Sequence, residues 1–130
     1  MFAGDGVLFS DIMAHLVSRL NTELSAQGYS YVRVGVKADD SDSQVIIRRD
    51  GGSRDSKTIM SSVIGVNIYE TTYARAEDLA LVVEAIFDDM PDGQPIVATS
   101  VQSSIQDVTD LKAERRFMRF AVTHRGTNLN

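Results

Sequence analysis

The sequence contains no cysteine among its 130 residues. This absence excludes a disulfide-linked scaffold, a zinc site built on thiolates and a cysteine nucleophile. Histidine is scarce too, so only His15 and His124 are available as imidazole bases or ligands. The fold must therefore be stabilised by packing alone.

A secretion signal and a membrane-spanning segment are also missing. The first residues, MFAGDGVLFSD, lack the basic region and the long apolar run of a signal peptide. No other apolar run approaches the length needed to cross a bilayer. We therefore expect a protein that is made and kept in the cytosol unless assembly carries it elsewhere, with no membrane partner.

Basic charge is in deficit overall and absent from one long segment. The net charge is −5 at pH 7, which argues against a general nucleic-acid binder. No lysine or arginine lies between Arg75 and Lys112, whereas residues 112–125 carry five basic residues against Glu114 alone. This pattern fits head-to-tail association, in which the acidic surface of one subunit meets the basic surface of the next in a ring. It also fits two solvated faces of an ordinary globular protein.

The most informative stretch is residues 62–90, where the hydrophobic period changes. Over residues 62–70, Ile64, Val66 and Ile68 alternate with residues of the opposite face. This alternation predicts a strand with one buried side.

A helix is expected directly after this strand, because the next apolar residues recur at helical spacing. Thr71 and Thr72 are candidate N-caps, and Pro91 ends the run. Leu81 falls on the outward face among acidic residues and is a candidate subunit contact, although single exposed leucines are common. The predicted buried arc consists of Ala76, Leu79, Val82, Val83, Ile86, Phe87 and Met90.

The remaining elements follow from the same two periods. A first helix is expected from residue 7 or 10 to residue 27, stopped by Gly28. The tail, residues 126–130, is expected to fray. The strand over residues 96–107 is expected to be an edge strand or a bulged one. The other expected strands are residues 31–37, 45–49 and 115–124.

Residues 50–58 form a polar connection with two adjacent glycines, which we read as too long for a tight hairpin. The segment and its flanks are locally basic, through Arg48, Arg49, Arg54 and Lys57. We interpret it as a mobile, positively charged arm that reaches a neighbouring molecule, the alternative being a plain exposed loop. Its glycines and Lys57 do not form a phosphate-binding loop.

These elements predict a single α+β domain over residues 1–130. A chain of this length can bury a core without the help of disulfides or metal ions. We expect one mixed or antiparallel sheet of about four to five strands, with two helices packed on one face in a split βαβ-like order. The other face of the sheet would be exposed or used in assembly.

No catalytic or metal-binding arrangement stands out. His15 and His124 are expected at solvent-facing or terminal positions, so no serine or threonine can be given a base. Asp39, Asp40 and Asp42 lack the spacing, central glycine and terminal glutamate of a calcium loop. We therefore predict a binding or structural protein that is not an enzyme and uses no cofactor or metal.

The order of elements resembles a known family. The segments that carry the likeness are VIIRR, the long connection, SVIGVNIYETTYARAEDLALVVEAIF, IVATSVQSS and RRFMRFAVTHRG. Over residues 7–125 they resemble the tail terminator proteins of long-tailed bacteriophages, which complete the tail and join it to the head.

The resemblance implies a small α/β protein that forms a hexameric ring on the tail tube and terminates tube polymerisation. Its partners would be further copies of itself, the tail tube protein and the head-tail connector protein, with DNA only as cargo passing through the ring. It would be assembled in the host cytoplasm and located in the tail or neck of the virion.

The candidate residues follow from the charge pattern and this analogy. Residues facing the lumen would be acidic so that DNA can slide without sticking, and the candidates are Asp88, Asp89 and Asp92. The candidate protein-interface residues are Arg48, Arg49, Arg54, Lys57, Leu81, Arg115, Arg116 and Arg119.

Other readings remain open at this point. The chain could be a different head-tail connector or a tail tube protein, since these proteins have a similar size and also assemble into rings. It could be a cytosolic ferredoxin-like module that binds a ligand or regulates a partner as a dimer. An enzyme would need a pocket that holds carboxylates with perturbed pKa values.

Overall fold

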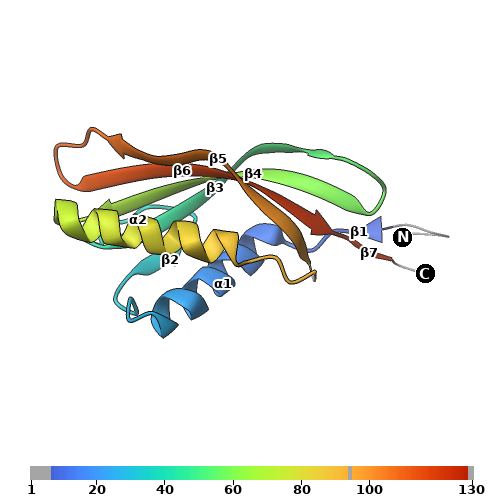
Figure 1. Ribbon diagram of the computed structural model, residues 1–130, viewed down its shortest axis with the longest axis horizontal. Helices are drawn as coiled ribbons and strands as arrows, with labels where there is room; N and C mark the ends of the chain where they lie inside the picture. Colours follow the sequence, from blue (N-terminus) through green and yellow to red (C-terminus); the bar gives the residue numbers. More distant parts are fainter. Residues whose placement is uncertain (1–6, 94, 129–130) are drawn as a thin grey trace.

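The computed structural model describes residues 7–93 and 95–128, with one main sheet and two helices on one side of it (Figure 1). Along the chain the elements are β1 (Val7–Leu8), α1 (Ile12–Ala26), β2 (Arg33–Gly35), β3 (Gln44–Arg54), β4 (Ile59–Glu70), α2 (Tyr73–Asp88), β5 (Ile96–Val108), β6 (Glu114–Arg125) and β7 (Thr127–Asn128). The main sheet has five strands in the order β2-β3-β4-β6-β5. Strands β1 and β7 form a separate antiparallel pair.

The sheet is mixed and contains a split βαβ unit. Strand β2 is parallel to β3, and all other neighbours are antiparallel. Because β6 lies between β4 and β5, these two strands run parallel to each other and are joined by α2. Both helices contribute to one core on the same side of the sheet (Figure 1). The predicted fold class is confirmed.

Helix α1 starts later than expected because its cap is Asp11. The Asp11 carboxylate accepts a hydrogen bond from the Ala14 backbone N–H at 3.1 Å, which satisfies one of the free donors of the first turn. Gly28 ends the helix with φ +89°, as predicted for a C′ glycine. The fully buried residues of α1 are Ile12, Leu16, Leu20 and Leu24.

Helix α2 agrees closely with the prediction. The Thr72 hydroxyl is the N-cap and accepts a hydrogen bond from the Arg75 backbone N–H at 3.3 Å. Phe87 stacks on Phe120 of β6, with ring centroids 4.2 Å apart, which attaches the helix to the centre of the sheet. All of the predicted arc is buried except Val82, which is partly buried.

The predicted loop over residues 50–58 is wrong. Strand β3 continues to Arg54 and β4 begins at Ile59, so these strands form one long hairpin that extends beyond the helices (Figure 1). The register shifts between Arg49 and Gly51, where the strand bulges. The two glycines serve the bulge rather than a loop: Gly52 has φ +154°, and a Cβ there would collide with the Ser61 carbonyl oxygen.

Two shorter segments also differ from expectation. Strand β2 covers only residues 33–35 rather than 31–37, and Val36 directly after it is exposed. Residues 127–128 pair with β1, although a frayed tail was predicted. Strand β5 is confirmed as a bulged edge strand.

Candidate interaction surfaces

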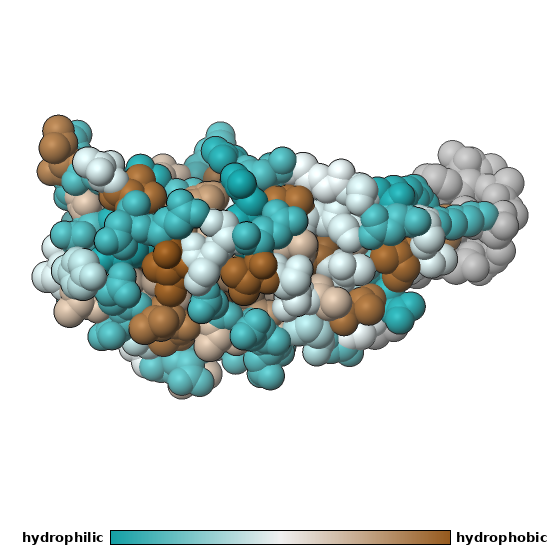
Figure 2. All heavy atoms as spheres, turned by 45° about the horizontal axis from the view of Figure 1, so that its top comes forward, coloured by the Kyte–Doolittle hydropathy of each residue, from teal (hydrophilic) through white to brown (hydrophobic). Residues whose placement is uncertain are grey.

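No helix of the described residues covers the face of the sheet opposite α1 and α2 (Figure 1). Residues of β4 and β6 that alternate with the core residues point to this outer face. Figure 2 shows that apolar residues reach this side as separate patches between hydrophilic ones. The surface is therefore a mixed polar and aromatic one, as is common in protein interfaces.

Arg115, a predicted interface residue, lies on this outer face and is already held in place. Its guanidinium donates a hydrogen bond to the Asn67 side-chain oxygen at 2.8 Å and lies 4.7 Å from the centre of the Tyr69 ring. Asp110 adds an ion pair at 3.7 Å. These contacts fix one face of the guanidinium while the side chain remains partly exposed.

Arg48 and Arg119, two further predicted interface residues, meet at a shared carboxylate. Asp50 accepts from Arg48 Nε at 2.7 Å and from Arg119 Nη2 at 3.3 Å. Gly65 leaves the room for this carboxylate, because a Cβ there would press against Asp50. Asp50 was not predicted as part of this surface, because the two glycines that follow it indicate a loop. Continuing the strand alternation past Arg49 would have found it.

Arg54 and Lys57 lie at the end of the β3–β4 hairpin, and Arg54 holds the turn together. Its guanidinium donates to the Lys57 carbonyl at 2.8 Å and lies 5.0 Å from the Phe9 ring centre. Hydrogen bonds from the hydroxyls of Ser53 and Ser61 lower the pKa of the neighbouring Asp55. The tip is thus an ordered, charged turn.

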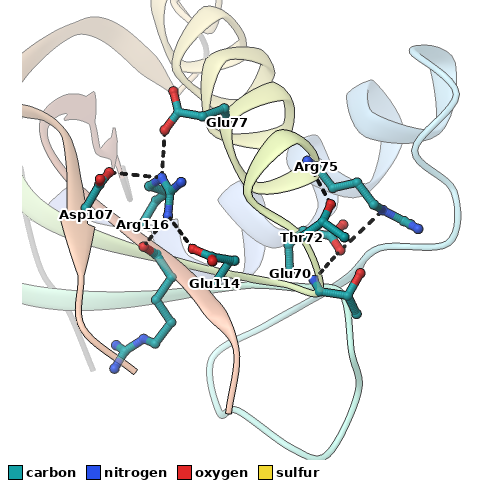
Figure 3. Close-up of polar contacts among 9 residues, drawn as sticks. Glu70, Thr72, Arg75, Glu77, Asp107, Glu114 and Arg116 are labelled. Atoms are coloured by element: carbon teal, nitrogen blue, oxygen red, sulfur yellow. Dashed lines mark hydrogen bonds and ion pairs between the residues drawn. The ribbon is translucent and has the colours of Figure 1, made fainter. Parts of the chain in front are cut away.

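Arg116 was predicted to be an exposed interface residue, and this is wrong. Its side chain is only 1% exposed and lies between α2, β5 and β6 (Figure 3). The guanidinium Nε contacts Glu77 at 2.7 Å and Asp107 at 3.1 Å, and Nη1 contacts Glu114 at 3.4 Å. Residue 116 shares the inward phase of β6 with the core residues Met118 and Phe120, which the sequence already contained.

The charge of Arg116 is strongly favoured in this position. Burial alone would lower the pKa of the guanidinium, but the hydrogen bond to Glu77, the charge of Asp107 and the hydrogen bond to Glu114 raise it above its usual value. The Tyr73 ring covers the group from one side at 4.8 Å. Arg116 is therefore a structural cation that attaches α2 to the sheet.

The outward face of α2 is acidic, as predicted. Leu81 is 54% exposed on this face, and Asp78 and Asp88 are also exposed. At the C-terminal end of the helix, Asp89 is exposed and Asp92 forms an ion pair with Arg19 of α1 at 3.2 Å. Asp88, Asp89 and Asp92 thus lie close together at and just after the C-terminal end of α2, and their orientation toward a lumen stays a prediction.

His124 was expected at the surface, and this is wrong as well. It is 1% exposed, and its Nε2 lies 3.0 Å from the hydroxyl of Ser62, which is also buried. Burial, with the charge of Arg49, lowers the pKa of His124. The pair has the contact of a nucleophile and its base, but His124 Nδ1 has no partner among the described residues and neither group is open to a substrate.

His15 is partly buried rather than fully solvated, and its side-chain Nε2 has no hydrogen-bond partner among the described residues. The acidic turn carries no calcium geometry: Asp39 binds Arg33 at 2.9 Å, and hydrogen bonds from Ser41 lower the pKa of Asp39. Within the described ranges, no cluster of acidic or histidine side chains is arranged to hold a metal ion. In the same ranges, no helix is long and apolar enough to cross a membrane.

No protein-family model matches the chain, and no curated protein matches its sequence. Three surfaces of the protein are candidates for contact with other molecules: the outer face of the sheet, the charged end of the β3–β4 hairpin and the acidic outward face of α2.

Proposed function

We propose that this chain is a structural subunit of a bacteriophage tail, which forms a ring that caps the tail tube, terminates its polymerisation and provides the surface for head-tail joining. The proposal places the protein in the tail or neck of the virion. Another connector or tube protein of the same neck is the nearest alternative.

The observation that carries the proposal is the one-sided construction of the domain. A sheet covered by helices on one face only has a second face, and here that face carries ordered arginines and aromatic rings, such as Arg115 over Tyr69. Arginine and tyrosine are enriched where proteins meet. A surface of this kind is suited to contact with other subunits.

The β3–β4 hairpin supplies a second contact. It projects beyond the helices (Figure 1) and ends in a turn held by Arg54. An ordered hairpin loses less conformational entropy on docking than a mobile arm would. We assign it to the contact with the tube or the connector.

Acidic residues at the C-terminal end of α2 would face passing DNA in such a ring. Asp89 is exposed there, whereas Asp92 is partly neutralised by Arg19. Carboxylates offer no phosphate contacts, so a duplex would slide past them.

The test is the mass of the protein in solution, measured by light scattering over a range of protein and salt concentrations, with negative-stain imaging of large species. We expect a ring, or a monomer that becomes a ring at the ends of phage tail tubes. Because charged surfaces meet, added salt should weaken the assembly. A dimer that is indifferent to salt and concentration would contradict the proposal and favour the regulatory module.

A further inference from the structure

A groove of about 930 Å³ lies between α1 and the edge of the sheet. It exists because β2 is so short: the last β2–β3 pair is Gly35 with Ile46, and among the described residues no strand pairs with that side of β3 further along. Its floor is apolar, formed by Met13, Val17 and Ile47.

The rim of the groove is basic. Arg33 and Arg48 are paired with carboxylates at 2.9 Å and 2.7 Å, respectively. Lys37 and Arg49 also line the groove, and neither has a carboxylate partner among the described residues. Val36 lines the groove as well and is 54% exposed. The groove therefore combines apolar surface with two cations that have no counter-charge among the described residues.

The outward face of α2 has the opposite character. Leu81 projects from it, Ala85 lies one turn further on and is small, and Asp78 and Asp88 flank the pair. Neither aspartate has a described ion-pair partner. This face therefore presents one apolar side chain between two carboxylates that have no counter-charge.

We propose that the groove binds the outward face of α2 from a second copy of this chain, with Leu81 inserted over the apolar floor and Asp78 and Asp88 at the basic rim. The stretch from Asp78 to Asp88 spans ten residue steps, about 15 Å of helix, with Leu81 between its two carboxylates.

The contact is heterologous, since the groove and the helix face are different surfaces of one subunit. Each copy can thus bind one neighbour through its groove and another through α2, as a ring requires. The inference deepens the proposed function, and it rests on the self-association that the proposed function requires. It moves Asp88 from the lumen to the subunit contact and leaves Asp89 as the lumen candidate.

The absence of cysteine allows a direct test. Leu81→Cys and Val36→Cys are made in separate preparations, one carrying a tag that changes its mass, and the two are mixed under mild oxidation. We expect a mixed disulfide dimer to form at least about fivefold faster than in the control, because docking raises the effective concentration of the two thiols. The control replaces Leu81→Cys by Leu111→Cys, since Leu111 is fully exposed and lies outside both surfaces.

A charge exchange makes the test specific. Arg49→Glu in the Val36→Cys chain should slow the cross-link, and Asp88→Lys in the Leu81→Cys chain should restore it. Cross-linking at the rate of the Leu111→Cys control, or rates that do not respond to the exchange, would overturn the inference. If rings form but this cross-link does not, the contact is rejected and the proposed function stands. If the cross-link forms but no rings appear at tube ends, the proposed function is rejected and the contact stands.

Discussion

Arg116 is a cation inside the protein, and its charge is balanced by carboxylates from three elements. Glu77 comes from α2, Asp107 from β5 and Glu114 from β6. The guanidinium is 1% exposed whereas its carboxylate partners are 32–70% exposed, so the arginine depends on these contacts for the compensation of its buried charge. The strength of this attachment can be measured by substitution.

Arg116→Ala should lower the free energy of unfolding by about 3 kcal/mol at pH 7, because a large buried side chain is lost and three carboxylates lose their shared cation. Urea unfolding measures this. Arg125→Ala, at an exposed position on the same strand, is the control and should change stability by less than about 0.5 kcal/mol. A loss for Arg116→Ala no larger than that of the control would contradict the explanation.

His124 makes stability depend on pH near neutrality. Because burial lowers its pKa in the folded protein, the unfolded chain binds the proton more readily. Stability should therefore be level above the unfolded value of about 6.5 and fall as the pH drops below it toward the folded pKa. His124→Gln, which can still bond to Ser62, should lack this loss. The measurement is urea unfolding between pH 8 and pH 5, and parallel curves for the two proteins would count against it.

Both inward-facing polar residues were missed for the same physical reason. The sequence phase of β6 placed Arg116 and His124 on the core side, but their polarity suggested solvent. Their burial depends on partners from distant segments, Glu77 for the arginine and Ser62 for the histidine. Strand periodicity gives the direction of a side chain, whereas tertiary contacts decide whether that direction is buried.

At the scale of elements, the β3–β4 hairpin depends on its glycine pair. Gly51 and Gly52 both have positive φ, at +132° and +154°, but only Gly52 has the Ser61 carbonyl in the space a Cβ would occupy. The two positions therefore separate the cost of backbone conformation from the cost of a collision.

Gly51→Ala should lower the free energy of unfolding by about 1 kcal/mol through backbone strain alone. Gly52→Ala should cost more than about 2 kcal/mol, since strain and collision act together. Chemical unfolding of the two variants gives the comparison, with Gly51→Ala as the matched control. Equal losses would mean that the strands are further apart at this point than described.

Elements with strong local signals were predicted well. Helix α2 has a cap, a full apolar arc and a proline after its end, and strand β4 has an unbroken alternation. The hairpin was misjudged because two glycines and several charges indicate a loop when taken alone. Strands β1 and β7 have only two residues each, so no period can be seen in them.

At the scale of the whole molecule, the sequence predicted the layers but not the surfaces. One sheet with helices on one face follows from the order and periods of the elements. The outer arginine network and the α1 groove depend on strand register and on how soon β2 ends. Neither property is encoded in a local pattern, so Arg48, Arg115 and Arg119 were identified as interface candidates while the contacts that group them were not.

The pairing of β1 with β7 has a consequence for the order of folding. Val7 lies opposite Asn128, so this ladder joins the two ends of the described chain. A contact of such long sequence separation carries a high entropic cost until the intervening segments are compact. We therefore expect the small ladder to form after the main sheet. Its pairing then distinguishes a completely folded subunit from a partly folded one.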